Sequence, residues 1–156
     1  MASAYTDALK LLARRELSER QVRERLTGKG YDQSEIDAAV VRLVEDRGID
    51  DQRVAEAIVR TQSGVKRRGA MRIARELQNA GIAPELAKQT LDSIVSDEDA
   101  EATLRAALSR RLPGDRRIAD DREFQRLYRF LLGQGFEIDR IRKALNARRG
   151  PGVDTD

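Results

Sequence analysis

The sequence has no cysteine and no histidine. Without cysteine, the chain can form no disulfide, no thiolate nucleophile and no cysteine-type zinc site. Without histidine, it lacks the commonest general base and the commonest metal ligand of proteins. We therefore expect no catalytic residue, no metal and no cofactor, and an enzyme is the least favoured class of function.

Aromatic residues and proline are also scarce. Aromatic residues make up 4% of the chain, and only three of its 156 residues are proline. The core must therefore be built from Leu, Ile, Val and Ala, and helices can run without interruption by proline. With 37% charged residues, this composition is typical of helix-rich proteins that expose much surface.

Long apolar runs are absent as well. The segment Met1–Lys10 lacks the apolar stretch of a signal peptide, and no window approaches the length of a membrane span. We expect a cytoplasmic protein with no membrane partner.

The charges present are unevenly distributed around a formal net charge of +3. Residues 1–50 carry nine Lys and Arg against ten Asp and Glu, whereas residues 100–150 carry thirteen against seven. The positive charge is thus concentrated in the C-terminal third, which favours an anionic partner or a protein–DNA assembly.

One pattern of apolar residues occurs three times, anchored on glycines that lie 51 and 54 residues apart. Relative to each glycine, apolar residues stand at positions −8, −4, +1, +6 and +10, with one alanine as the only small member. The first copy is Val22, Leu26, Gly30, Tyr31, Ile36 and Val40; the second is Ile73, Leu77, Gly81, Ile82, Ala87 and Leu91; the third is Leu127, Leu131, Gly135, Phe136, Ile141 and Leu145.

This spacing predicts a helix, a glycine turn and a second helix in each copy. The glycine suits the positive φ that a helix C-terminus requires, and the next apolar residue can pack back onto the helix. A further helical pattern precedes each pair. Its apolar residues are Ala4, Ala8, Leu11 and Leu12, then Val54, Ala55, Ile58 and Val59, then Leu104, Ala107 and Leu108.

Capping signals mark the predicted helix starts. Two segments have the spacing of a capping box, and others place a cap, a proline or acidic residues at a first turn. These signals are Ser18–Gln21, Asp32–Glu35, Asp50, Pro84 and Ser96.

No alternating strand pattern is present. We predict an all-α protein of nine helices, arranged as three tandem three-helix, helix-turn-helix-like repeats that form an elongated curved body. The predicted units are residues 3–49, 50–98 and 99–149. We expect a longer, mobile internal loop from Pro113 to Arg122 in the third unit, and a flexible tail over residues 150–156.

Paired carboxylates offer little catalytic chemistry. The pairs Asp50–Asp51 and Asp120–Asp121 are adjacent in sequence, and adjacent residues on a helix do not face one another. Asp50 is better explained as the cap of a helix that begins at Asp51. The segment Gly64–Gly69 lacks the spacing and the preceding strand of a phosphate-binding loop.

Basic side chains are the candidate contact residues. The densest cluster stands near a predicted helix start, where positive charge opposes the helix dipole, and no acidic residue lies between Ile58 and Arg75. A contact with a partner competes here with a solvated loop, and in the third unit with local ion pairs to Glu123, Glu137 and Asp139. The candidates are Lys66, Arg67, Arg68 and Arg72, then Arg126, Arg129, Arg140, Arg142 and Lys143.

The helix–glycine–helix spacing also resembles a DNA-reading helix-turn-helix. However, the helices that would read bases open with carboxylates, and few side chains there suit base edges. Base-specific DNA binding is therefore unfavourable, whereas weak nonspecific contact with phosphates remains possible. A passive helical scaffold for another protein is the third alternative.

Three segments of the sequence resemble the RecX family of RecA modulators. The runs Gly48–Ala55, Lys66–Ile82 and Leu127–Ile141 are similar to its motifs, and the likeness covers about residues 4–147. Val54 stands where the family usually has phenylalanine, and Gly133-Gln134 where basic residues are common.

The resemblance implies tandem three-helix repeats and a RecA-binding bacterial protein of the SOS response. Family members bind in the groove of the RecA–DNA filament and usually inhibit its ATPase, strand exchange and co-cleavage of LexA. Some also touch DNA. We therefore expect a non-enzymatic, monomeric regulator whose basic residues contact the filament or DNA phosphate.

Overall fold

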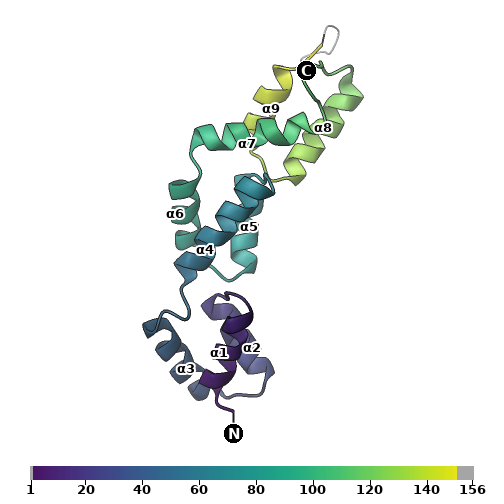
Figure 1. The fold of residues 1–156 in the computed structure, drawn as a ribbon. Helices are drawn as coiled ribbons and strands as arrows, with labels where there is room; N and C mark the ends of the chain where they lie inside the picture. Colours follow the sequence, from purple (N-terminus) through teal and green to yellow (C-terminus); the bar gives the residue numbers. More distant parts are fainter. Residues whose placement is uncertain (1, 151–156) are drawn as a thin grey trace. The chain divides into compact units, whose positions relative to one another are not determined.

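The structure is a computed structural model that describes residues 2–150 (Figure 1). Nine α-helices and one π-helical turn lie in this range, and the one β-feature there is an isolated bridge between Ile118 and Arg149. The predicted all-α fold of three tandem helix trios is confirmed. The elements are α1 Ala4–Arg14, α2 Glu19–Gly28, α3 Gln33–Glu45, α4 Asp51–Arg60, η1 Thr61–Val65, α5 Ala70–Asn79, α6 Pro84–Ile94, α7 Asp97–Ser109, α8 Asp121–Gly133 and α9 Ile138–Asn146.

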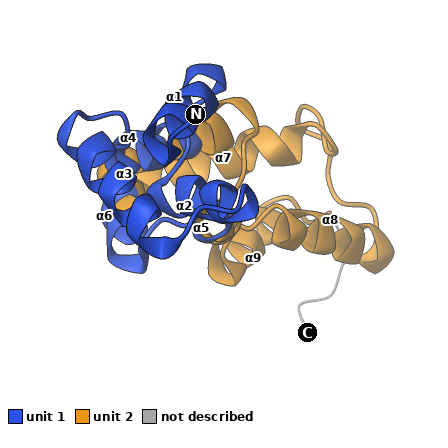
Figure 2. Cartoon of the chain, turned by 90° about the horizontal axis from the view of Figure 1, so that it is seen from below, with its two compact units in different colours: residues 1–58, 76–90 blue, residues 59–75, 91–156 orange. Residues whose placement is uncertain are grey.

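Two compact units divide the chain within its middle helix trio (Figure 2). Unit 1 comprises Met1–Ile58 and Glu76–Thr90, and unit 2 comprises Val59–Arg75 and Leu91–Asp156. The repeat boundaries at 49/50 and 98/99 remain a prediction. Most of the tail predicted for 150–156 lies outside the described residues.

The three anchor glycines end their helices in the same way. Their φ angles are +94° at Gly30, +87° at Gly81 and +94° at Gly135, in the left-handed region that glycine tolerates. The N–H of the following residue donates to the carbonyl five residues earlier, at 3.3 Å from Tyr31 to Leu26 and 3.0 Å from Ile82 to Leu77. This bond defines a Schellman turn, so the predicted C-cap glycines are confirmed.

The repeated apolar positions form the cores. Of the fifteen aligned residues, thirteen are buried, while Tyr31 and Leu91 are half-buried. One apolar cluster lies in the first trio and includes Leu26 and Ile36, and a second lies in the third trio and includes Leu131 and Ile141. The periodicity in the sequence therefore marked the buried faces correctly.

The predicted helix starts are confirmed. Ser18, Asp32 and Ser96 each take part in a capping box. Asp50 accepts the Arg53 N–H at 3.2 Å, and α6 begins at Pro84. The carboxylate of Asp50 is thus used to cap a helix.

The long loop of the third trio is anchored, which the expectation of a mobile loop did not foresee. Ile118 is fully buried, and its N–H donates to the Arg148 carbonyl at 2.8 Å. The Arg148 guanidinium donates to the carbonyls of Gly114 at 2.7 Å and Arg116 at 2.8 Å. Because these partners lie thirty or more residues apart, no local pattern in the sequence indicates their contacts.

The first junction between helix trios lies within unit 1. There the Ser18 hydroxyl donates to the Ala80 carbonyl, and the Arg20 guanidinium donates to the carbonyls of Asn79 at 2.8 Å and Gln78 at 3.2 Å. The C-terminal carbonyls of α5 carry partial negative charge, so an arginine is favourable there. The glycine turn at the end of α5 thus packs against the N-terminus of α2.

Asp51 adds a second link to this junction. Its carboxylate accepts the N–H of Glu19, the first residue of α2, at 2.9 Å. Burial raises the pKa of Asp51, and the hydrogen bond from the Glu19 N–H opposes this shift. Both aspartates of the Asp50–Asp51 pair therefore serve helix N-termini, each on a different helix.

The second junction lies within unit 2 and repeats this arrangement. The N–H of Gly69 donates to the Gln134 carbonyl at 2.8 Å, and the Arg72 guanidinium donates to the Gly133 carbonyl at 3.2 Å. Ser18 and Gly69 both stand twelve residues before their anchor glycine, and each donates to the carbonyl just before the next anchor glycine. The two junctions therefore join corresponding positions of the repeat.

Close approach explains why a glycine is needed at both docked turns. A Cβ built on Gly81 would lie 2.7 Å from the Arg20 Cβ, and one built on Gly135 would overlap the Arg72 Cβ and backbone nitrogen. A Cβ on Gly30 would meet no atom within 4 Å. Gly30 thus serves only the turn, whereas Gly81 and Gly135 serve the turn and the junction.

Candidate partner-binding surface

The predicted basic cluster stands on an irregular segment between α4 and α5. The helix α4 continues directly into the π-helical turn η1, where the Ser63 hydroxyl donates to the Val59 carbonyl at 2.7 Å. Lys66 ends this turn, and Arg67 has a φ of +53°. Because π turns and left-handed non-glycine residues are uncommon and costly, they often mark functional sites.

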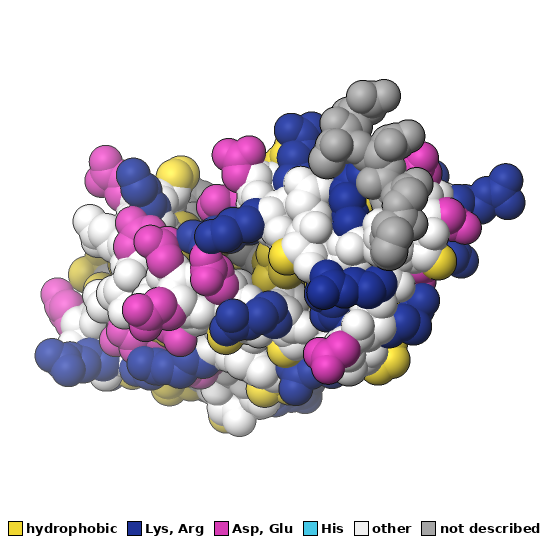
Figure 3. Space-filling view, turned by 90° about the horizontal axis from the view of Figure 1, so that it is seen from above, with side chains coloured by type: hydrophobic (Ala, Val, Ile, Leu, Met, Phe, Trp, Pro, Cys, Tyr) yellow, Lys and Arg dark blue, Asp and Glu magenta, His cyan; other side chains and the backbone are white. Residues whose placement is uncertain are grey.

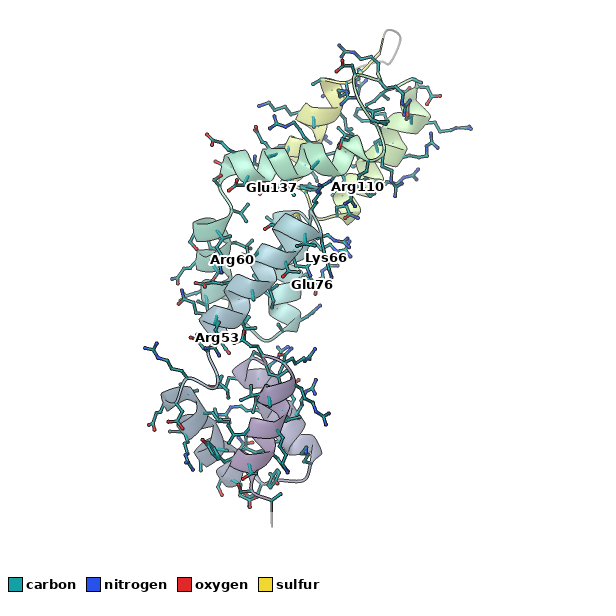
Figure 4. The ribbon with its side chains drawn as sticks, in the orientation of Figure 1. Arg53, Arg60, Lys66, Glu76, Arg110 and Glu137 are labelled. Carbon is teal, nitrogen blue, oxygen red and sulfur yellow. The ribbon has the colours of Figure 1, made fainter. Side chains whose placement is uncertain are left out.

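The four basic residues of this cluster divide into two pairs. Lys66 is exposed and Arg67 is half-buried, and neither side chain makes a hydrogen bond or ion pair with another residue in the range 2–150. Figure 4 labels Lys66 beyond the end of α4. The pair Lys66–Arg67 is thus available to a partner.

Arg68 and Arg72 instead hold the second junction. Arg68 donates to the Gln134 side-chain oxygen at 2.9 Å, and its Nε is buried with no acceptor among residues 2–150. Arg72 donates to the Gly133 carbonyl at 3.2 Å. The four residues expected to act together therefore have two different environments.

Two exposed apolar side chains flank the free pair. Val65 is 73% exposed and Met71 is 60% exposed, the two highest values among the large apolar side chains that the structure describes. The free basic pair and its apolar neighbours, which we call the 65–71 patch, comprise Val65, Lys66, Arg67 and Met71. The sequence analysis did not identify Val65 and Met71 as part of a contact surface. The available signal was that neither residue occupies a buried position of the apolar repeat.

The basic residues of the third trio also divide. Arg140 forms ion pairs with Asp97 at 2.7 Å, Glu137 at 3.6 Å and Glu101 at 3.8 Å, so it links α9 to α7. The other predicted contact residues are exposed on two helices; they are Arg126 and Arg129 on α8, and Arg142 and Lys143 on α9.

Glu123 does not pair as the sequence suggested. It is buried, and it accepts a hydrogen bond from Arg116 and another from the Ala119 N–H at 2.8 Å. The hydrogen bond from Arg116 is the main reason that the pKa of Glu123 lies below its ordinary value. Glu123 therefore fixes the loop before α8.

Charge on the surface is mixed. On the face shown in Figure 3, Lys and Arg side chains lie in separate groups, with acidic and uncharged side chains between them.

No group of three or more Asp and Glu side chains that could hold a metal ion occurs among residues 2–150. No helix in the same range is long and apolar enough to cross a membrane. The fold consists of helix trios that are joined by two similar junctions.

Comparison with known proteins gives consistent results. Family models for the first, second and third three-helix domains of RecX match residues 4–43, 50–91 and 97–145. The Regulatory protein RecX of Halorhodospira halophila is 37% identical over 150 residues, which cover 92% of this chain and 90% of that protein. The Regulatory protein RecX of Trichlorobacter lovleyi is 33% identical over 146 residues, which cover 91% and 93%.

A solved structure supports the same fold. The crystal structure of RecX from Lactobacillus salivarius has a TM-score of 0.77 at 23% identity, over 92% of this chain and 95% of that chain. The fold defines a tandem array of three three-helix domains. The extent of the family matches makes the assignment specific: this chain belongs to the RecX family of regulatory proteins.

Proposed function

We propose that this chain is a RecA regulator that binds in the groove of the RecA–DNA filament and lowers its ATPase, strand-exchange and co-protease activities. The general role rests on family membership along almost the whole chain. It acts as a cytoplasmic monomer and carries out no catalysis of its own.

The observation that carries the proposal is the 65–71 patch. Lys66 and Arg67 have no partner within the described chain, and Val65 and Met71, close to them in sequence, are exposed. A partner surface that combines carboxylates or phosphates with an apolar area would satisfy all four side chains. The left-handed Arg67 fits this role, since strained backbone is retained where function uses it.

The tandem array explains how weak contacts could suffice. Arg126, Arg129, Arg142 and Lys143 are exposed in the third trio and form the proposed second contact region. Two linked contacts raise the effective concentration of each other, so binding is stronger than either contact gives alone. A protein that bridges neighbouring filament subunits would resist the movements that accompany ATP turnover.

Direct DNA contact is proposed to be weak and nonspecific. The helices that a helix-turn-helix would place in the major groove are α3, α6 and α9. In α3, Asp32 and Glu35 form a capping box and stand at the end that would meet DNA. We expect binding to short duplexes to be independent of sequence and strongly reduced by salt. Binding to one sequence that survives physiological salt would favour the helix-turn-helix alternative.

The test is the ATPase activity of RecA on single-stranded DNA. We expect the parent protein to lower ATP turnover at concentrations well below that of RecA. The variant Lys66→Glu/Arg67→Glu should lose most of this effect. Arg68 is left unchanged because its bond to Gln134 belongs to the junction.

A matched control has the same change of charge elsewhere. Arg14 and Lys88 are exposed on α1 and α6, and the variant Arg14→Glu/Lys88→Glu should inhibit like the parent. Both variants should melt close to the parent, because none of the four side chains is buried and surface substitutions typically change stability by about 0.5 kcal/mol. If the parent leaves ATP turnover and filament length unchanged at equimolar protein, the proposed function is wrong and a scaffold role gains.

A further inference from the structure

The glycine turn of the first helix trio resembles the other two, but no helix N-terminus among residues 2–150 is docked on it. The turn Thr27–Gly30 ends α2 as a Schellman turn, with Gly30 at φ +94°. A Cβ built on Gly28 or Gly30 would meet no atom within 4 Å. In the equivalent turns, Gly81 and Gly135 are covered by Arg20 and Arg72.

The turn is also bonded to Asp7 of α1. The Tyr31 hydroxyl donates to Asp7 at 2.6 Å, and the Lys29 ammonium lies 3.7 Å from the same carboxylate. The carbonyls at the end of α2 carry the partial negative charge of a helix C-terminus. A preformed acceptor surface loses little entropy when a donor binds, which favours docking.

Both docked turns show which donor fits such a surface. In each junction, the receiving element is the N-terminus of a helix, with a donor at its N-cap and an arginine in its first turn. The donor is the Ser18 hydroxyl in one case and the Gly69 N–H in the other. The chemistry that fits Thr27–Gly30 is therefore a helix N-terminus with an arginine on its first turn.

This chain has no free copy of that donor on the second helix of any trio. The N-terminus of α2 binds the Ala80 turn and that of α5 binds the Gln134 turn. The N-terminus of α8 is covered by its own loop, where Glu123 binds Arg116 and the Ala119 N–H. The first-turn arginines of α4 and α9 are also held, Arg53 by Glu16 and Arg140 by Asp97. A second copy that continues the array head to tail is therefore unfavourable, and we assign the donor to another protein.

We propose that Thr27–Gly30 is a docking site for the N-terminal turn of an arginine-bearing helix on a RecA subunit. The choice of RecA as the partner rests on the proposed function. The contact with RecA would thus have the same geometry as the junctions between the trios of this chain. The glycine turn of the first trio is free to make it, whereas the N-terminus of α8 in the third trio is covered by its own loop.

The test places a Cβ at position 30 in two variants. Gly30→Ala and Gly30→Asn occupy the space where the docked turns admit arginine, and asparagine tolerates positive φ better than alanine does. Gly114→Asn is the matched control, because Gly114 has a φ of +61° and a Cβ there meets no atom within 4 Å. Binding to RecA filaments on single-stranded DNA is measured by sedimentation or fluorescence anisotropy, beside thermal unfolding of each variant.

We expect both Gly30 variants to bind filaments about tenfold more weakly, while Gly114→Asn binds like the parent. Gly30→Asn and Gly114→Asn should have similar melting temperatures. If folded Gly30 variants bind like a binding-competent parent, this inference is wrong and the proposed function stands. If the parent binds no filament, the proposed function fails, and the RecA assignment of this site fails with it. A parent dimer that Gly30→Asn dissociates would show that a second copy is the occupant, against the proposal.

Discussion

The two junctions between helix trios share a backbone arrangement but differ in the atoms that complete it. In the first, the hydroxyl of Ser18 meets the Ala80 carbonyl; in the second, the backbone N–H of Gly69 meets the Gln134 carbonyl. Removing the side chain at position 69 lets the next turn approach until a Cβ would overlap Gly135. The first junction is thus the looser one and is bonded through side chains, whereas the second is tighter and is bonded through the backbone.

The comparison teaches that one glycine pattern has two physical causes. A positive φ is common to Gly30, Gly81 and Gly135, whereas close approach applies only to the last two. The same substitution at all three glycines therefore has the same cost from positive φ, and the differences in stability measure the cost of close approach.

The largest effect is expected for Gly135→Ala. Alanine at positive φ costs about 1–2 kcal/mol, and its Cβ would also overlap backbone atoms of Arg72, which cannot move without shifting α5. With a typical overpacking cost, we expect a loss of about 3–5 kcal/mol in the free energy of unfolding, measured by urea denaturation. A loss no larger than that of Gly30→Ala would show that the second junction is not tightly packed.

Gly81→Ala should have a smaller effect. Its Cβ would meet side-chain atoms of Arg20, at 2.7 Å from Cβ and 2.7 Å from Nε, and part of this side chain is exposed and can move. We expect a loss of about 2–3 kcal/mol by the same urea measurement. The order Gly135, Gly81, Gly30 is the result that matters, and any reversal would contradict the contrast between tight and loose junctions.

Glu123 tests the closed end of the array by pH. Its pKa is lowered in the folded protein, chiefly by the hydrogen bond from Arg116, so its contribution to stability is present above the unfolded pKa and is lost as pH falls through the folded value. Glu123→Gln should cost about 1–2 kcal/mol near pH 7. The variant should also lose less stability than the parent between about pH 5 and pH 3. Parallel pH profiles of unfolding would exclude an ionised, hydrogen-bonded Glu123.

The smallest effect is expected in the free turn. Tyr31→Phe removes the hydroxyl that bonds Asp7, and this hydrogen bond is the main cause of the lowered pKa of Asp7. We expect a small loss of stability near pH 7 and a rise in the Asp7 pKa, seen by NMR titration. An unchanged Asp7 titration would show that Tyr31 does not hold the turn.

Local sequence signals predicted most of the fold. The glycine pattern predicted the Schellman turns, and Ser18, Asp32 and Ser96 predicted helix starts, because caps and helical periodicity depend on residues within about one turn. The same reasoning failed for the loop before α8, since its anchors at Arg148 and Gly150 come from the far end of the third trio.

The candidate site was predicted less completely. Sequence reasoning located the basic segment but grouped Arg68 and Arg72 with Lys66 and Arg67, because charge and spacing do not reveal which side chains find acceptors. It also had no signal for the π turn, which ends α4 without proline or a strong cap.

The sequence by itself determined the helices, their turns and the three buried faces, because each depends on propensities and periodicity that repeat along the chain. Only the tertiary structure decided which arginines hold junctions, why two of the three anchor glycines can carry no side chain, and which turn remains open. Those properties depend on how closely two backbone segments approach that are more than fifty residues apart in the chain. A local sequence pattern does not determine that approach.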